Sequence, residues 1–222
     1  MITRSIFTFL AKHIPFTYAW LVRRMAGEPR TVLDIGCGTG HFMSLVKKNS
    51  WQITGIDIHK KTAEEARTSG IYKEVLVGDL VEVCKGLVKD RKKYDLVFCS
   101  QVIEHISRND GTELLNLMDK LYKKKIYVGT PRGYMVQPGE FLGDNIYQRH
   151  KSGWSELDFT SRGYKVYGVG FSLVWAEKGL ARSTNGLMRF VLVLISFLFS
   201  PLSLFVPSMA SGIMAIKSSN NE

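Results

Sequence analysis

Three glycines on alternate positions follow an apolar run and an acid near the start of this chain. The stretch reads Thr31-Val-Leu-Asp-Ile-Gly-Cys-Gly-Thr-Gly40, and a helix-like segment begins at His41. This order predicts a buried strand, a tight turn without Cβ atoms, and a helix N-terminus with free N–H groups. Such a turn lets a nucleotide-like ligand lie against bare main chain.

From Thr31 the chain alternates between apolar runs and amphipathic segments. The runs predict strands over Thr31–Ile35, Trp51–Ile56, Glu74–Val77, Tyr94–Cys99 and Ile126–Gly129. Apolar residues three and four positions apart predict helices between them, and Gly70 is placed to end the one over Lys61–Thr68. Later, Tyr164–Phe171 and Ser211–Lys217 have the pattern of strands. We therefore predict an α/β fold with a Rossmann-like doubly wound sheet, mostly parallel with an antiparallel last strand, and helices on both faces.

An acid stands at the end of each of the first three predicted strands. These acids are Asp34, Asp57 in Gly55-Ile-Asp-Ile58, and Asp79. Ligands of open α/β sheets bind beyond the carboxyl ends of the strands, so we expect these acids to face one ligand. A dinucleotide fold does not require the third acid, and its Gly-x-Gly-x-x-Gly pattern places the third glycine one position later than Gly40.

Four motifs in chain order resemble those of the class I S-adenosylmethionine-dependent methyltransferases. They are Val32-Leu-Asp-Ile-Gly-Cys-Gly-Thr-Gly40, Gly55-Ile-Asp57, Gly78-Asp79-Leu80 and Tyr94-Asp-Leu-Val-Phe-Cys-Ser-Gln-Val-Ile-Glu-His105. The resemblance runs from about Thr31 to Pro131 and more loosely to Lys217, and is to small-molecule and lipid-type enzymes such as the ubiquinone-pathway O-methyltransferases. It implies S-adenosylmethionine as cofactor and methyl transfer to a small or lipid-like acceptor, at oxygen or nitrogen.

The resemblance also implies roles in holding the cofactor. The glycines would let the main chain approach the methionine and ribose portions, Asp34 would orient the loop and reach the methionine amino group, and Asp57 would hold the ribose hydroxyls. The implied cofactor-binding residues are Asp34, Gly36, Cys37, Gly38, Gly40, Asp57, Ile58, Asp79, Leu80, Ser100 and Gln101. For Asp79 the alternative is an N-cap of the helix that follows.

Glu104 and His105 lie a few residues after the fourth predicted strand and are candidates for acid–base chemistry. Because the cofactor is already activated, a base is needed only for a hydroxyl or a protonated amine. Related enzymes carry the motif Glu-x-x-Glu-His, which binds a divalent metal. In this chain Gln101 stands at the position of the first glutamate of that motif. Losing that charge disfavours a hard cation, so we expect no metal. The alternative for His105 is a structural residue hydrogen-bonded to a neighbouring strand.

A long connection after the fifth predicted strand, Thr130 to Lys151, holds further candidates. They are Arg132, Tyr134, Tyr147, Arg149 and His150. Connections of this length are usually functional, and in related methyltransferases this one helps to form the acceptor pocket. We expect His150 to be a catalytic base, together with His105 and Glu104, the alternative being an ordinary histidine in a solvated loop.

The net charge of +10 favours an anionic neighbour. The basic residues are scattered, without a long tail or a stripe interleaved with aromatic residues, so nucleic acid is not favoured. Three cysteines without metal-type spacing are expected to be buried thiols of a cytoplasmic protein. Residues 1–30 are expected to be a basic helical segment rather than a secretory signal.

Leu187–Val206 is nearly all apolar. It is about as long as a membrane-spanning helix, but Pro201 divides it, and a span would separate the last strand from its sheet. We expect an insertion, 180–207, in a methyltransferase domain formed by 31–178 and 208–217. An interfacial or re-entrant hairpin on the inner face of a membrane fits this arrangement. An apolar lid over the acceptor site and a homodimer contact are the alternatives.

Two other functions stay open at the level of sequence. An RNA methyltransferase is supported by the charge alone, and a non-catalytic S-adenosylmethionine-binding protein agrees with intact motifs that lack a strong base. Fold does not choose among them.

Overall fold

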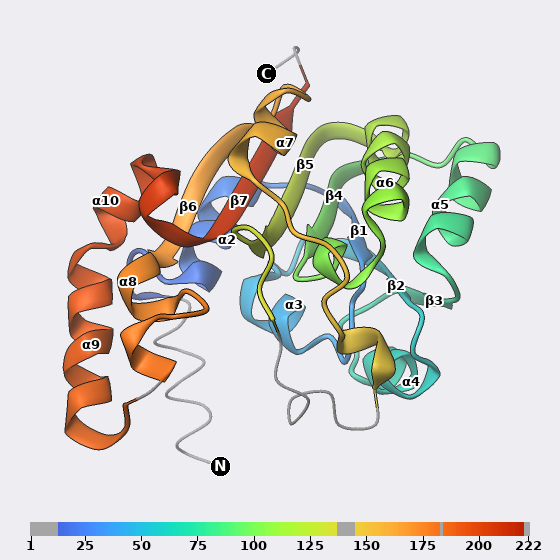
Figure 1. Cartoon of the computed structure of the whole chain (residues 1–222). Coiled ribbons are helices and arrows are strands. Elements are labelled where there is room, and N and C mark those ends of the chain that lie inside the picture. The colour runs from blue at the N-terminus through green and yellow to red at the C-terminus, as the bar shows by residue number, and fades with distance from the viewer. Residues whose placement is uncertain (1–12, 137–144, 183, 220–222) are drawn as a thin grey trace. The chain divides into compact units, whose positions relative to one another are not determined.

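The structure is a computed structural model that describes residues 13–136, 145–182 and 184–219. These residues form a seven-stranded sheet in the order β3-β2-β1-β4-β5-β7-β6 (Figure 1). The strands are β1 Thr31–Ile35, β2 Gln52–Asp57, β3 Glu74–Val77, β4 Tyr94–Ser100, β5 Tyr122–Pro131, β6 Lys165–Phe171 and β7 Ala210–Ser218. Strand β1 is parallel to β2 and β4, β2 is parallel to β3, and β7 is antiparallel to β6. The predicted mixed, Rossmann-like sheet is confirmed.

Most of the helices lie between strands in the chain order. The helices are α2 Tyr18–Ala26, α3 His41–Val46, α4 Lys60–Thr68, α5 Leu80–Lys89, α6 Arg108–Leu121, α7 Glu156–Thr160, α8 Ser172–Trp175, α9 Gly186–Leu198 and α10 Ser200–Phe205. Short 3-10 turns are η1 Ile103–His105, η3 Ile146–Gln148, η4 Leu180–Arg182 and η5 Pro207–Met209. In α5, Leu80, Cys84 and Leu87 are buried on one side, as their spacing predicts.

The chain divides into two compact units. The first holds Met1–Cys99, Thr112–Tyr127 and Ser218–Glu222, and the second holds Ser100–Gly111 and Val128–Lys217. In the first unit the apolar strand residues Val32, Leu33 and Ile56 are fully buried, as expected for parallel strands covered on both faces. The three cysteines are buried thiols that form no disulfide with one another, as predicted.

Helix α2 lies against α3 in the first unit. Thr17 caps its start by accepting a hydrogen bond from the Trp20 N–H at 3.3 Å. The Arg23 guanidinium donates to the carbonyls of Val46 and Lys47, at 3.1 and 2.8 Å, which satisfies free acceptors at the end of α3. The first twelve residues of the predicted basic segment lie outside the described residues.

In the second unit, β6 and β7 form an antiparallel pair whose register joins Phe171 to Ala210. The chain between them forms α8, α9 and α10 (Figure 1). Helix α10 packs closely on β6, because a Cβ atom at Gly168 would overlap the Ser203 carbonyl. Pro201 stands in the first turn of α10, so the apolar segment is divided at the proline.

The apolar side chains of α9 and α10 are largely exposed, and we call them the apolar surface. Its members are Leu187, Met188, Phe190, Val191, Val193, Leu194, Phe197, Leu198, Phe199, Leu202, Phe205 and Val206. On α9 only Leu192 and Ser196 are buried. Within the described residues, no helix combines the length and apolar character that crossing a membrane requires.

Candidate functional site

A left-handed main chain at three glycines shapes the loop after β1. Their φ angles are +72° at Gly36, +53° at Gly38 and +79° at Gly40, a region that side chains with a Cβ rarely adopt. Gly40 also begins α3, as its N-cap. The sequence therefore needs glycine here for its backbone conformation, and the loop presents main-chain groups at a helix start.

Asp57 at the end of β2 ties this loop to its own strand. One carboxylate oxygen accepts the Gly38 N–H at 2.7 Å, and the other accepts the His59 N–H at 2.8 Å and the Thr62 hydroxyl at 3.2 Å. The Ile56 carbonyl accepts the N–H groups of the first two loop residues at 2.7 and 2.9 Å. The carboxylate keeps acceptor capacity beyond these three bonds.

Asp34 lies beneath the loop and is buried. Its carboxylate accepts the Tyr72 hydroxyl at 2.7 Å. Burial raises the pKa of the Asp34 carboxyl to about 7, although the Tyr72 hydrogen bond acts in the opposite direction. Asp34 therefore changes its charge near neutral pH, and an ionised Asp34 would attract a cationic ligand group.

The end of β3 joins this arrangement through the main chain. The Gly78 N–H donates to the Asp57 carbonyl at 3.1 Å. The next residue, Asp79, caps α5 by accepting the N–H groups of Val81 and Glu82 at 3.0 and 3.1 Å. The alternative role of Asp79, as the N-cap of a helix, is thus observed. Both hydrogen bonds go to the same carboxylate oxygen, which leaves the other oxygen of Asp79 for a ligand.

The remaining implied cofactor residues take different positions. Ile58 follows β2 directly, and Leu80 is buried as the first residue of α5. Ser100 is the last residue of β4. Gln101 has φ +57°, and its N–H donates to the Gly129 carbonyl at 2.7 Å. A left-handed glutamine immediately after a strand marks a sharp turn there.

A cluster of one carboxylate and two imidazoles lies in the second unit. The ligand atoms of Glu104, His105 and His150 are all within 4.8 Å of one another. The two imidazole rings meet edge to face with centroids 4.8 Å apart. We call these three side chains the acid–base cluster. They are the three catalytic candidates expected from the sequence.

The segment after His150 is fastened to η1 by several hydrogen bonds. The N–H groups of Lys151 and Ser152 donate to the Glu104 carbonyl at 2.7 and 3.1 Å. The Ser152 hydroxyl and the Trp154 indole N–H both donate to the Ile103 carbonyl, at 3.0 and 3.3 Å. Trp154 is almost fully buried, so its indole ring anchors the segment that carries His150.

Burial changes the titration of two cluster members. It raises the pKa of Glu104 to about 7 and lowers that of His105 to about 4, with the neighbouring His150 lowering the latter further. One Glu104 oxygen accepts the Thr130 hydroxyl at 3.1 Å, whereas the other has no hydrogen-bond partner among the described residues. His105 is therefore neutral at pH 7, whereas Glu104 changes its charge near neutral pH.

The orientation of His150 follows from one contact. Its Nδ1 lies 2.7 Å from the Met135 carbonyl oxygen, which can only accept. Nδ1 must therefore carry a proton, so the neutral ring has its lone pair at Nε2. A ring held in this way can take a proton from a bound acceptor.

Glu104, His105 and His150 could also hold a metal ion. Two imidazoles and one carboxylate suit zinc, iron or manganese better than magnesium, which prefers oxygen ligands. The glutamine at position 101 supplies no carboxylate. The expectation that the enzyme uses no metal stays a prediction.

Other residues of the connection after β5 have structural contacts. The Arg132 guanidinium pairs with Glu156 at 2.6 Å. The Tyr134 hydroxyl donates to the His150 carbonyl at 3.3 Å. Tyr147 lies in η3 and Arg149 follows it, while residues 137–144 of this connection lie outside the described residues.

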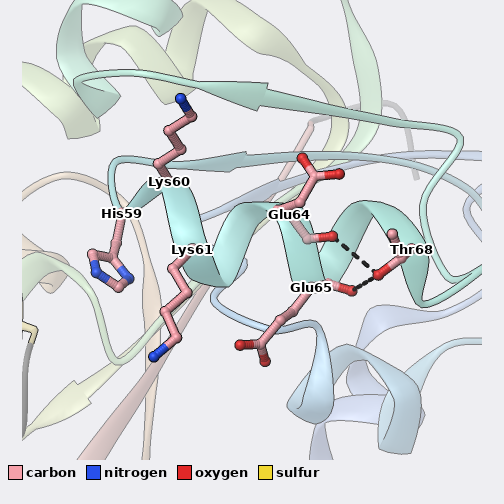
Figure 2. A pocket seen from close by; sticks show the side chains of 6 residues that line it. All are labelled: His59, Lys60, Lys61, Glu64, Glu65 and Thr68. Carbon is pink, nitrogen blue, oxygen red and sulfur yellow. Dashed lines mark hydrogen bonds between the residues drawn. The ribbon is translucent and has the colours of Figure 1, made fainter.

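An open hollow of about 800 Å³ lies along α4. Figure 2 shows its lining side chains, which are His59, Lys60, Lys61, Glu64, Glu65 and Thr68. All six come from α4 and the residue before it. They include two lysines and two glutamates, so the formal charges of these four side chains cancel. This is the surface of a single solvated helix, and we assign it no ligand.

The sequence did not single out Tyr72 or Trp154. Tyr72 stands alone between a helix and a strand, and no motif spacing involves it. Trp154 contacts η1 about fifty positions earlier in the chain. An isolated aromatic residue gives no local signal for a partner that distant.

Fold and glycine loop together define a class I S-adenosylmethionine-dependent methyltransferase. A family model described as a methyltransferase domain, Methyltransf_23, matches residues 7–136, which is more than half of the chain. The protein belongs to this family.

Curated relatives are similar over part of their length. The ubiquinone biosynthesis O-methyltransferase of Bordetella avium is 30% identical over 95 residues, which cover 41% of this chain and 39% of the relative. The corresponding enzyme of Coxiella burnetii is 22% identical over 92 residues, with the same coverage. The match thus spans about two fifths of these relatives.

Solved structures share the fold over nearly the whole chain. A SAM-dependent methyltransferase from Archaeoglobus fulgidus has a TM-score of 0.57 at 21% identity, covering 96% of this chain and 99% of that one. The plantazolicin methyltransferase BamL, solved with a triazolic desmethylPZN analog and S-adenosylhomocysteine, has a TM-score of 0.52 at 16% identity, covering 99% of this chain and 88% of that one. At these identities the comparison shows the fold.

Proposed function

We propose that this methyltransferase transfers a methyl group to a hydroxyl or amine of a small, lipid-like acceptor, and that it works at a membrane surface. The observation that carries the first part is the acid–base cluster. Methyl transfer to a hydroxyl or a protonated amine needs a proton acceptor, and alignment supplies most of the remaining catalysis. Relatives named ubiquinone biosynthesis O-methyltransferases support the acceptor class.

His150 is the proposed base. Its Nε2 lone pair is directed by the hydrogen bond from Nδ1 to the Met135 carbonyl. His105 stays neutral beside it, so the neighbour adds no positive charge that would oppose protonation of His150. Glu104 is placed to stabilise the protonated ring.

The cofactor is assigned to the strand ends of the first unit. The three glycines, Cys37 and the acids Asp34, Asp57 and Asp79 would hold it, with Ile58 and Leu80 beside the adenine. Ser100 and Gln101 begin the second unit, and a role for them rests on the family resemblance alone. S-adenosylhomocysteine in the solved relatives supports this assignment. The bound cofactor supplies the electrophilic methyl group.

The decisive experiment uses radiolabelled S-adenosylmethionine with separated lipid, small-molecule and RNA pools. We expect label in the lipid pool. The His150→Ala variant should lower turnover about a hundredfold or more while cofactor affinity changes less than about twofold. The exposed His13→Ala variant is the control. Unchanged turnover in His150→Ala contradicts the base, and label in RNA alone contradicts the acceptor class.

Chelation separates the base from a metal site. Dialysis against a chelator should leave turnover unchanged if the acid–base cluster works without metal. Loss of turnover with recovery on adding zinc, iron or manganese would instead assign Glu104, His105 and His150 as ligands.

The apolar surface supports membrane contact. Its exposed residues cover roughly 220° of the circumference of α9, counting 100° per residue. A folded protein partner would cover one side of such a helix. The acyl chains of lipids can instead surround the helix on three sides. The stretch 178–217 carries four basic residues and no acid. This charge favours contact with anionic lipid headgroups over contact with a second copy of the protein, whose stretch is also positive.

Vesicle binding tests this contact. We expect the protein to sediment with vesicles that contain an anionic phospholipid. Replacing Phe190, Leu194 and Leu198, one stripe of α9, by serine should weaken binding about tenfold or more. Serine at Ile146 and Leu157, equally exposed but off the apolar surface, is the control. A protein that stays in the supernatant, or that forms a dimer through these three residues, contradicts the proposal.

A further inference from the structure

Tyr72 occupies the space behind the glycine loop. It lies just before β3, and its side chain is largely buried. Its hydroxyl donates to the Asp34 carboxylate at 2.7 Å. None of the four cofactor motifs includes this residue, although it contacts two of them.

The ring of Tyr72 rests on two glycines. A Cβ atom at Gly40 would lie 2.7 Å from Cε2 of the ring, and one at Gly55 would lie 3.0 Å from Cδ1. Both distances are shorter than ordinary contact, so the ring fills space that only glycine leaves open. One side chain therefore supports the end of the loop, the middle of β2 and Asp34 near the end of β1.

We propose that Tyr72 is a positioning residue for cofactor binding, which holds the Asp34 carboxylate through its hydroxyl and supports the glycine loop through its ring. The two functions of the side chain are separable, because phenylalanine keeps the ring and removes the hydroxyl. The inference concerns cofactor uptake and goes beyond the proposed acceptor and base.

The hydroxyl has a direct electrostatic consequence. Asp34 is buried, and the ionisable groups that face it are Tyr72, Cys37 and Asp57. Burial and the Asp57 charge favour the protonated carboxyl, the Cys37 thiol is held protonated by burial, and the Tyr72 hydrogen bond favours the carboxylate. Without the hydroxyl, the pKa of Asp34 rises above about 7 and less carboxylate is present at neutral pH.

An ionised Asp34 matters for a ligand with a cationic amino group. The aminoacyl part of S-adenosylmethionine and its demethylated product carries such a group. An ionised carboxylate attracts an ammonium group and accepts its hydrogen bonds. A protonated carboxyl binds the same group more weakly. Tyr72 thereby links cofactor affinity to pH.

Calorimetric titration of the full chain with S-adenosylhomocysteine, from pH 6 to pH 9, tests this inference. In the wild type, affinity should rise with pH through about 7. Tyr72→Phe should bind about tenfold more weakly at pH 7, with the deficit shrinking to about twofold at pH 9. Asp34→Asn should bind weakly at every pH.

Tyr94→Phe is the control, because it removes a half-buried tyrosine hydroxyl from the same unit that pairs with Thr54 rather than Asp34. Its affinity and pH dependence should equal those of the wild type. If Tyr72→Phe folds and binds as the wild type does at every pH, or if the wild-type affinity does not depend on pH, the inference is overturned. Should Tyr72→Phe fail to fold, the contrast between the wild type and Asp34→Asn decides. Because no acceptor is present, the result does not depend on the proposed methyl acceptor.

Discussion

Asp57 in the first unit and Glu104 in the second are both buried acids at or just after the end of a strand, but different contacts hold them. Both oxygens of Asp57 accept hydrogen bonds, two of them from main-chain N–H groups. One oxygen of Glu104 accepts a single hydroxyl, and the other has no partner in the described part of the chain. A satisfied acid fixes a loop, whereas an unsatisfied one beside two imidazoles is available for chemistry.

The two regions also differ in how far apart their residues stand in the sequence. The glycine loop and Asp57 lie within about twenty-five positions, and short motifs encode them. In the acid–base cluster, by contrast, His105 and His150 stand far apart in the sequence. The contacts of Trp154 with η1 hold the segment that carries His150 near His105. Substitutions should therefore affect the two regions separately.

The largest effect is expected at Trp154. Replacing it by alanine removes an indole ring that is almost fully buried and that stacks under the Arg108 guanidinium at 3.9 Å. We expect a loss of about 3–5 kcal/mol in the free energy of unfolding, measured by denaturant titration. The exposed Leu157→Ala is the control. In the milder Trp154→Phe, turnover should fall while S-adenosylhomocysteine affinity stays, and equal losses in both would contradict separate regions.

Asp57→Ala should have the next largest effect. It removes the acceptor for Gly38, so the loop loses its tie to β2. S-adenosylhomocysteine affinity should fall about a hundredfold by calorimetry, because a buried charged acceptor and its ligand bonds are lost together. Asp90→Ala, an exposed acid at the end of α5, should bind normally. Normal binding by Asp57→Ala would show that the loop does not need this acid.

Two glycines of the loop give a matched pair. A Cβ at Gly38 meets nothing within 4 Å, whereas one at Gly40 meets the Tyr72 ring. Gly38→Ala should cost about 1 kcal/mol of stability from backbone strain alone, and Gly40→Ala about 2–3 kcal/mol from strain and overlap. Thermal melts of both variants measure the difference. Equal costs would show that the ring moves aside freely.

The smallest effect concerns the stability of the protein without cofactor. Because the fold raises the pKa of Asp34 from 3.8 to about 7, the folded state binds a proton that the unfolded state releases between these values. Stability should therefore fall as pH rises from about 4 to about 7 and stay lower above it. Asp34→Asn should remove this loss, so that its stability changes less than that of the wild type between pH 5 and pH 8, measured by denaturant titration. A variant whose stability changes with pH as much as that of the wild type would contradict burial as the cause.

Local patterns predicted the strands of the first unit, the glycine turn and the division of the apolar segment at Pro201, because each depends on residues close in sequence. Strand β5 begins at Tyr122, earlier than its predicted start at Ile126. The first residues of β5 were not predicted because positions 123–125 are lysines. The apolar run indicates only the buried part of this strand. Tyr72 and Trp154 were not predicted, because their importance comes from tertiary contacts rather than spacing.

The pairing of Phe171 with Ala210 has a consequence for protein engineering. Residues 172–209 leave and rejoin adjacent strands at facing positions, so a two-residue type I′ turn such as Asn-Gly could close the gap in their place. Such a variant would lack α8, α9 and α10, and with them the packing of α10 on β6. The shortened enzyme would show which properties belong to the catalytic fold.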